Sequence, residues 1–459
     1  ISYICTMKKI TLVLIILLIN NLLLSQENFQ KCKTTSLMLD EFEKNESYFN
    51  VIKSRKIPEK EYLKTTITIP IVIHIIHRNT HLSIGSGTNI SDEQIEDQIR
   101  ILNEDFSQTN PEFPNPPRST FINNAGNPNL QFCLATTDPD GNPTNGITRT
   151  STTKINWDAD DNSNSICHEA NAMKKTSCGG KDGWDPSRYL NIWVCDLTNS
   201  QSNGMTLGYA YLPGLLADFD PSNDYKDGLV VDYRYFGSNG IATNTSDGRT
   251  ATHEIGHYLG LMHTFCEETD NQGNWICCDN DNNFLGGFVD DTPAAKDIYF
   301  GIVSSNTNNN SCNDISYNNI YNTDVMDMDE NFMAYSFNTW MFSQSQVDAM
   351  ISTLNTQDWL AGRLNLKNSN VSRNCSGLIS NTVSINKNHP SFNISNGYLH
   401  INSSSNIENL IVFDILAKIV YEIKKPDNLV NLNQLNNGVY FIKTSIAKQQ
   451  FTTKIHLVK

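Results

Sequence analysis

The stretch THEIGHYLGLMHTF, residues 252–265, constrains this chain more than any other feature, because three of its ten histidines fall within it. On a helix, His253 and His257 are four residues apart and project from one face, so both imidazoles can bind one ion. Gly260 permits the positive φ at which helices commonly end, so that His263 returns toward the same ion. Three imidazoles leave a fourth position for water, which is typical of catalytic zinc.

Glu254, beside the first histidine, completes the pattern. It is poorly placed to be a ligand on the same face, but it can reach a water held by the metal, accept its proton and pass that proton to a leaving amine. With this chain's own residue frequencies, the five fixed positions of HExxHxxGxxH arise by chance with odds on the order of 10⁻⁵. The sequence therefore predicts a catalytic zinc centre with Glu254 as general base.

These residues resemble the long zinc motif of the metzincin metallopeptidases, which is followed by a Met-turn. NFMAYS at 331–336 matches that turn. The resemblance implies that Met333 forms an apolar floor beneath the zinc and that Tyr335 lends its phenol to the oxyanion of the reaction. Within this clan the chain is similar to the pappalysin family over roughly residues 65–355. The matching stretches are GRTATHEIGHYLGLMHTF, DDTP (290–293), FCLATTDPDGNPTNGITR (132–149) and GGKDGWDPSRYLNIWVCDL (179–197).

The order of predicted elements fits this resemblance. β-branched residues and apolar runs predict buried strands, and helical periodicity predicts two helices, the first of which opens with a serine cap. We expect an α/β (α+β) metzincin-like catalytic domain over residues 61–363, with a twisted mixed sheet and an active-site helix. The predicted strands are 65–76, 189–197 and 227–236, and the predicted helices are 91–106 and 343–355.

The N-terminus has the order of an export signal. From Met7, two lysines precede an apolar run over 10–24, and small and polar residues follow at Ser25. A membrane anchor is the alternative, but about 20 unbroken apolar residues are needed to span a bilayer and this run is shorter. We expect a signal peptide over 7–26, with residues 1–6 outside the natural product, and a secreted or cell-surface protein.

Residues 27–60 are polar and charged and predict a removable pro-segment, with a helical pattern around residues 37–53. Cys32 lies near its start, and pappalysin relatives carry a similar cysteine. Its thiolate would fill the fourth zinc position in a latent precursor and displace the water that Glu254 activates. The alternative is a disulfide from Cys32 to a cysteine such as Cys375. Cleavage among the basic residues at 53–60 would release the inhibitor.

The cysteine count favours disulfides. All of the 11 cysteines except Cys5 follow the predicted signal peptide, and an oxidising compartment promotes pairing. No CxxC spacing suggests a sulfur-only zinc site. If Cys32 is unpaired, at least one more cysteine must also be free, and Cys133 and Cys195 in apolar segments are the candidates.

Cysteines after the zinc motif are expected to pair. The resemblance implies a bridge from Cys312 to either Cys277 or Cys278. Cys266 follows the motif directly and is expected to be a disulfide partner rather than a ligand, because three histidines already fill the protein's share of the coordination.

Other candidate metal residues are weaker. Calcium is a second metal that the resemblance suggests, but Gly287 stands where the family is usually acidic, which argues against a site there. Asp224, Asp227 and Asp232 are spread over a turn and a strand and predict a solvated acidic loop rather than a calcium site. His74 lies in a predicted strand and is expected to be a packing residue.

The C-terminal part changes character. An Asn- and Ser-rich linker is expected at 364–380, and alternating strands over 381–459 predict a small all-β sandwich. LNNGVYFIKTSIAKQQFTTKIHLVK resembles the sorting domains of the type IX secretion system, which implies the secretion machinery as a partner. A carbohydrate- or protein-binding sandwich is the alternative, although no cluster of aromatic residues suggests a sugar platform.

Charge and motifs together define the expected function. A net charge of −15 argues against nucleic acid as a partner, and no later stretch is apolar enough for a stable membrane span. We expect a secreted zinc endopeptidase that acts on protein or peptide substrates. The alternatives are a catalytically inactive cell-surface binding protein on a peptidase fold, and a zinc amidase, which the family's open strand-binding cleft disfavours.

Overall fold

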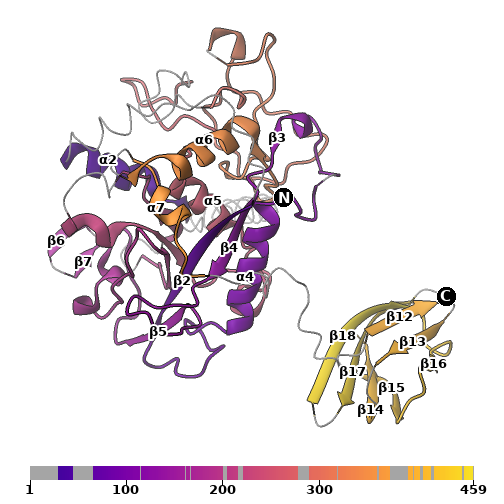
Figure 1. Ribbon diagram of the computed structural model, residues 1–459. Coiled ribbons are helices and arrows are strands. Elements are labelled where there is room, and N and C mark those ends of the chain that lie inside the picture. Colours follow the sequence, from indigo (N-terminus) through magenta and orange to yellow (C-terminus); the bar gives the residue numbers. More distant parts are fainter. Residues whose placement is uncertain are drawn as a thin grey trace, which may run out of the picture. The chain divides into compact units, whose positions relative to one another are not determined.

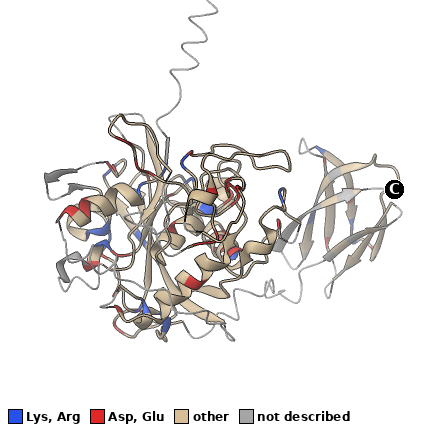
Figure 2. Ribbon diagram, turned by 90° about the horizontal axis from the view of Figure 1, so that it is seen from above, with Lys and Arg blue, Asp and Glu red and all other residues tan. Residues whose placement is uncertain are grey.

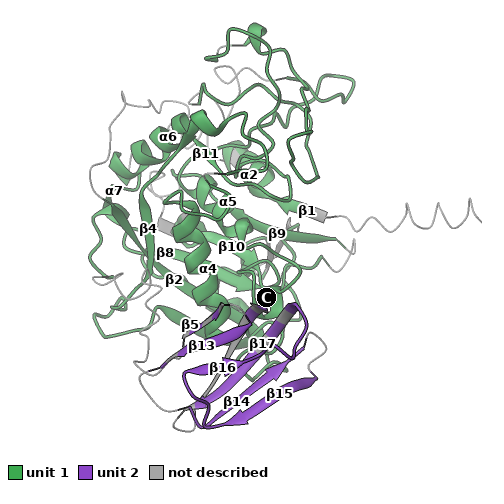
Figure 3. Ribbon diagram, turned by 90° about the vertical axis from the view of Figure 1, so that its right-hand side faces the viewer, with its two compact units in different colours: residues 1–375 green, residues 376–459 purple. Residues whose placement is uncertain are grey.

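The computed structural model divides the chain into two compact units, residues 1–375 and 376–459 (Figure 3). The described residues are 29–44, 66–372 and 391–457, with gaps at 114, 161, 166, 200–203, 215–220, 278–288, 318, 359–360, 396, 404–406, 415–417 and 447–448. The predicted signal peptide, the basic residues at 53–60, Cys278, Gly287 and Cys375 lie outside the described residues.

A mixed sheet forms the centre of the first unit (Figure 1). Its strand order is β1-β9-β10-β8-β2-β4, and β5 also pairs with β2. β2 runs parallel to β4, β5 and β8, whereas β9 is antiparallel to β10. The strands are β1 (Phe29–Cys32), β2 (Ile67–Arg78), β4 (Leu130–Leu134), β5 (Ile147–Thr152), β8 (Leu190–Cys195), β9 (Met205–Ala210) and β10 (Leu229–Asp232). This confirms the predicted metzincin-like fold class.

The core of this unit lies between the sheet and its helices. β2 is buried along nearly its whole length, as its run of isoleucines predicts for a parallel strand covered on both faces. α4 (Asp92–Asp105) begins at Ser91, whose hydroxyl accepts a hydrogen bond from Gln94 N at 3.2 Å. Isoleucines of β2 and α4 pack with apolar residues of α5 (Arg249–Tyr258) and α6 (Gln344–Asn355) in one core. The predicted helices at 91–106 and 343–355 are therefore confirmed.

Shorter elements complete the first unit. They are α2 (Thr34–Lys44), α7 (Leu364–Lys367), β3 (Ala125–Gly126), β6 (Asn162–Ser165), β7 (His168–Glu169), β11 (Phe342–Ser343) and the 3₁₀ helices η1 (Ile122–Asn124), η2 (Ala172–Lys174), η3 (Thr176–Cys178), η5 (Pro221–Lys226), η6 (Gly240–Ala242) and η7 (Asp314–Ser316). α2 begins three residues before the predicted helical pattern at 37–53, directly after Lys33.

The expected linker at 364–380 begins too early. Leu366 on α7 is only 1% exposed and joins the core, and the carbonyl of Val371 accepts hydrogen bonds from Thr136 N and Thr137 N. The Asn and Ser residues that suggested a linker alternate here with buried apolar side chains. Residues 364–372 therefore belong to the first unit.

The prediction of a solvated acidic loop is wrong for two of its three residues, Asp227 and Asp232. Asp227 is buried and pairs with the guanidinium of Arg363 at 2.9 Å. Asp232 is buried and pairs with Arg234 at 2.8 Å. A carboxylate can be buried when a guanidinium compensates for its lost hydration. No local pattern identifies Arg363 as this partner, because it lies 136 positions away from Asp227.

The second unit is a small antiparallel sandwich, as predicted. One sheet contains β12 (Ser391–Ser395), β13 (Tyr398–Asn402) and β16 (Leu429–Asn431), and the other contains β14 (Asn409–Phe413), β15 (Ile419–Lys424), β17 (Gly438–Ile446) and β18 (Gln449–Leu457). Alternate side chains, among them Leu410, Val412 and Ile442, form its own core. The unit therefore has the hydrophobic interior of an independent domain.

Acidic and basic residues are interspersed along the ribbon of the first unit (Figure 2). Among the residues that the structure describes, no helix combines the length and hydropathy needed to cross a bilayer.

Candidate active site and metal centre

Helix α5 and the turn after it bring three histidines together. His253 and His257 lie one helical turn apart, and their Nε2 atoms are 3.2 Å from each other. The helix ends at Tyr258, and Gly260 adopts a φ of +96° that redirects the chain. As a result, Nε2 of His263 lies 3.1 Å from Nε2 of each of the other two.

The opposite ring nitrogens determine what the three Nε2 atoms can do. The three Nδ1 atoms lie 2.7 Å from the Phe332 carbonyl, 2.8 Å from the Leu261 carbonyl and 2.9 Å from a carboxylate oxygen of Glu267. These oxygens can only accept, so each neutral ring carries its proton on Nδ1 and presents a lone pair at Nε2. Three converging lone pairs repel one another unless a cation lies between them.

The spacing fits a small tetrahedral metal ion. Zinc at about 2.0–2.1 Å from imidazole nitrogens would separate them by about 3.3 Å, and the observed separations are 3.1–3.2 Å. Burial lowers the pKa of His257 to about 3 and that of His253 well below its usual value. Both rings are therefore neutral at physiological pH, as metal ligands must be.

A thiol from the N-terminal segment lies at the same point. Sγ of Cys32 and the ligand nitrogens of the three histidines all lie within 4.8 Å of one another, and this is the one such group among the described residues. Cys32 is buried and unpaired, so the alternative of a disulfide to Cys375 does not hold in this structure. Three nitrogens and one sulfur are a donor set suited to zinc.

Glu254 lies beside this group and is fully buried. Its Oε2 accepts hydrogen bonds from the Cys32 thiol at 3.4 Å and from the Thr34 hydroxyl at 3.2 Å. Its Oε1 has no hydrogen-bond partner among the described residues. Burial raises the pKa of Glu254 to about 8, and a carboxyl group that titrates near neutrality is suited to accept and release a proton.

Met333 and Tyr335 border the histidines from the turn at 331–336. Met333 is fully buried against α5, where a Cβ on Gly256 would lie 2.3 Å from its sulfur, so only glycine leaves room for it. The Tyr335 ring lies 5.0 Å from the His263 ring, and its hydroxyl is 3.5 Å from the Cys32 carbonyl oxygen. The phenol therefore faces the space that Cys32 occupies.

The N-terminal segment lies at this site as a strand. β1 pairs in parallel with β9, which places Cys32 opposite Gly208. Lys31 lines a cavity of about 250 Å³ next to His253, and its ammonium group donates to the Ser336 carbonyl at 2.9 Å. Further along, Glu41 on α2 forms an ion pair with Lys226 at 2.7 Å.

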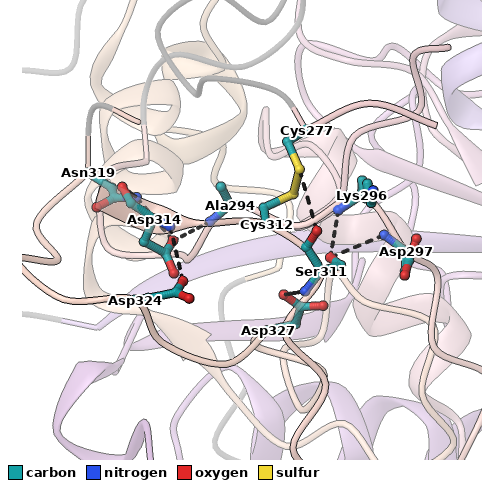
Figure 4. The surroundings of a disulfide bond; sticks show 10 residues. All are labelled: Cys277, Ala294, Lys296, Asp297, Ser311, Cys312, Asp314, Asn319, Asp324 and Asp327. Atoms are coloured by element: carbon teal, nitrogen blue, oxygen red, sulfur yellow. Dashed lines mark hydrogen bonds between the residues drawn. A yellow bond between two sulfur atoms is a disulfide. The ribbon is translucent and has the colours of Figure 1, made fainter. Parts of the chain in front are cut away.

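The disulfides resolve the alternatives that the sequence left open. Cys277 pairs with Cys312, and Cys167 pairs with Cys178. Figure 4 shows the first of these beside Ser311, whose backbone N–H donates to Asp327 at 3.1 Å. The bridge and this carboxylate together fix the loop that follows the zinc motif.

Two further cysteines, Cys133 and Cys266, are also disulfide-bonded. Cys133 is thus not the second unpaired cysteine that we considered. Cys195, buried in β8, is free.

Three contributors to the site were not identified from the sequence. Thr34 donates to Glu254 and accepts from Ala210 N at 3.0 Å, Glu267 contacts His263, and β9 pairs with the N-terminal segment. For Glu267, the one local signal was its position four residues after His263. An acid and a histidine at that spacing face each other on a helix, but this segment is not helical.

A three-histidine centre with an adjacent buried glutamate, on a ten-residue helix packed against a mixed sheet, defines the class of metallopeptidases. The chain belongs to the pappalysin family of these enzymes. Residues 175–355 match the family model described as pregnancy-associated plasma protein-A, and residues 393–458 match the secretion system C-terminal sorting domain.

Solved structures and curated proteins agree with this assignment. Mature mirolysin from Tannerella forsythia, solved with a cleaved peptide, is 34% identical, with a TM-score of 0.52, over 66% of this chain and 97% of that one. A promirolysin mutant from the same organism is 32% identical, with a TM-score of 0.54, over 74% and 97%. An extracellular metalloprotease of Neurospora crassa is 29% identical over 60% of this chain and 70% of its own length. The protein is a secreted or cell-surface metalloendopeptidase.

Proposed function

We propose that this protein is a zinc endopeptidase made as a latent precursor, with Glu254 as its general base. The observation that carries the proposal is the convergence of three histidine Nε2 atoms beside the buried Glu254 carboxyl group. His253, His257 and His263 would hold the zinc. When bound, zinc supplies Lewis-acid activation of water and of the substrate carbonyl.

Glu254 handles the protons. Its carboxylate takes a proton from the attacking water and later delivers it to the amine of the leaving peptide. The unpartnered Oε1 and the raised pKa support this role, because the group must hold the proton between the two steps. Removal of the N-terminal segment would free Oε2 from Cys32 and Thr34 as well.

Tyr335 and β9 position the substrate. The Tyr335 hydroxyl points to the carbonyl oxygen of Cys32, and we infer that it donates to the oxygen of a substrate carbonyl that becomes negatively charged. β9 pairs with β1 on one side and with β10 on the other. Once β1 leaves, β9 is an open sheet edge that can pair with an extended peptide.

Residues 27–60 serve as the pro-segment in this proposal. Cys32 would supply its thiolate as a fourth donor to the three histidines, with its proton passing to the adjacent Glu254 carboxylate, to which the Thr34 hydroxyl also donates. The segment therefore blocks the metal position and the base at once. Cleavage among the basic residues at 53–60 would permit its release.

The C-terminal unit serves export in this account, through the secretion machinery that recognises such domains. It forms its own core, and its match to a sorting domain replaces the alternative of a sugar-binding sandwich.

The test uses the full-length precursor, activated by limited trypsin treatment. We expect about one zinc per chain by elemental analysis and cleavage of casein or gelatin. A chelator should abolish the cleavage and added zinc should restore it. An inactive binding protein on this fold would leave both proteins intact even when loaded with zinc, and a zinc amidase would cleave only small substrates.

A further inference from the structure

We propose that Glu267 is a positioning residue that orients His263 toward the metal. This inference rests on the proposed zinc centre. Oε2 of Glu267 accepts the Nδ1–H of His263 at 2.9 Å. The proposal goes beyond the motif, because Glu267 lies outside HExxHxxGxxH.

The three histidines differ in how they are held. His253 and His257 project from α5, whose backbone fixes their positions, and their Nδ1 atoms face carbonyl oxygens. His263 follows the helix in a segment without regular structure. It is the one ligand whose outer nitrogen meets a carboxylate rather than a backbone group.

Ring packing alone cannot orient His263. Its ring stacks on Phe265 with centroids 4.8 Å apart and an interplanar angle of 8°, and the Tyr335 ring meets its edge. These contacts fix the ring plane, but a 180° rotation about the Cβ–Cγ bond keeps that plane and places Cε1 where Nε2 lay and Cδ2 where Nδ1 lay. A hydrogen-bond acceptor at Nδ1 selects the orientation in which Nε2 faces the metal.

Glu267 is itself well anchored. The preceding residue, Cys266, is disulfide-bonded, and its N–H donates to the Ala295 carbonyl at 2.7 Å. The Glu267 side chain is 26% exposed, so the carboxylate is partly shielded from water. A partly buried carboxylate also makes the imidazole a stronger donor to a metal than a carbonyl partner does.

The N-terminal segment uses the same oxygen. The hydroxyl of Thr35 donates to Oε2 of Glu267. In the latent chain this atom therefore binds both a metal ligand and the inhibitory segment, and after activation it binds His263 alone. The effect of Glu267 on metal binding must therefore be measured in the activated protein, from which the N-terminal segment has been removed.

The experiment compares Glu267→Ala, Glu267→Gln and the control Glu268→Ala in the activated full chain. Glu268 is adjacent and exposed. The readouts are the zinc dissociation constant, from competition with a chromophoric chelator, and the visible spectrum of the cobalt-substituted protein. We expect Glu267→Ala to weaken zinc binding by about 10–100-fold and to alter the cobalt spectrum. The glutamine variant should recover most of the affinity, because its amide oxygen can still accept from Nδ1. Glu268→Ala should match the wild type.

Thermal unfolding of the metal-free proteins separates a positioning role from a folding defect. Equal melting temperatures for wild type and Glu267→Ala would assign the loss to metal binding. Unchanged zinc affinity in Glu267→Ala, or a glutamine variant no better than alanine, would overturn the role of Glu267. A wild-type protein that binds no zinc would instead refute the proposed function.

Discussion

The sulfur of Cys32 lies 3.4 Å from Oε2 of Glu254, although 222 positions separate the two residues in the chain. The same sulfur lies among the ligand nitrogens of the three histidines. One thiol thus reaches both the metal position and the base. Because β1 runs parallel to β9, it pairs with the active-site sheet as an added strand, and α2 follows directly after it.

Replacing Cys32 should release the precursor from latency. Cys32→Ser removes the soft sulfur donor, and a hydroxyl is a poor substitute for a thiolate on zinc. We expect this precursor to cleave a quenched peptide, or to process itself, without added protease. Cys195→Ser, which changes the other cysteine that is free and buried among the described residues, should stay latent. A Cys32→Ser precursor as silent as the wild type would exclude the thiol from the inhibition.

Tyr335→Phe should affect the chemical step more than binding. The hydroxyl acts on charge that develops in the transition state, so kcat should fall by about 10- to 1000-fold with little change in KM. Steady-state kinetics on a peptide substrate measure both constants. Tyr398→Phe, in the second unit, is the control. A normal kcat in Tyr335→Phe would remove this phenol from the mechanism.

The second unit should be dispensable for catalysis. A chain that ends at Cys375 keeps residues 364–372, which belong to the first unit, and lacks residues 376–459. After activation it should hydrolyse peptides at the wild-type rate but accumulate inside the native host. If a folded truncation loses peptide hydrolysis, the second unit contributes to the active site and its assignment to export alone is wrong.

His74 predicts a pH dependence of stability. It is buried, its Nδ1 accepts from the Thr148 hydroxyl at 2.8 Å and its Nε2 donates to Asn191 at 3.0 Å, which satisfies the neutral ring. Burial lowers the pKa of His74 to about 4, whereas an unfolded histidine titrates near about 6.5. The unfolded chain therefore binds more protons between these values. The contribution of neutral His74 to the free energy of unfolding is fully present above pH ~6.5. Up to about 3 kcal/mol of it is lost as the pH falls toward 4.

Tryptophan fluorescence can follow this effect, because all six tryptophans belong to the first unit. Denaturant unfolding at pH 7.5 and 4.5 should show a smaller loss of stability on acidification in His74→Gln than in the wild type. His81→Gln should keep the wild-type dependence. Equal pH dependences for wild type and His74→Gln would show that His74 does not resist protonation in the fold.

Local patterns predicted much of this structure. The isoleucine run of β2, the serine cap of α4 and the spacing of His253 and His257 each express a rule that acts within a few residues. The same holds for the alternating strands of the second unit. Such features can be read from one sequence because the interactions that specify them are short-ranged.

Contacts between distant segments could not be predicted in this way. β9 has the sequence MTLGYA, without the apolar run that marked β2, and it is ordered by pairing with β1 and β10. Arg363 was assigned to a domain boundary, yet its guanidinium neutralises buried Asp227 and donates to the Tyr258 carbonyl at 2.7 Å. The strand partners of β9 and the contacts of Arg363 depend on how distant segments pack in the folded chain.

Catalysis in the proposed mechanism requires both a bound metal and the carboxylate of Glu254, and these two requirements can be measured separately. Zinc content and casein cleavage should be measured on the same activated samples of wild type, Glu254→Ala and His263→Ala. Glu254→Ala should retain about one zinc per chain and lose at least about 10²-fold in kcat, because only the proton carrier is removed. His263→Ala should lose both metal and activity. Near-normal cleavage by zinc-loaded Glu254→Ala would exclude Glu254 as the general base.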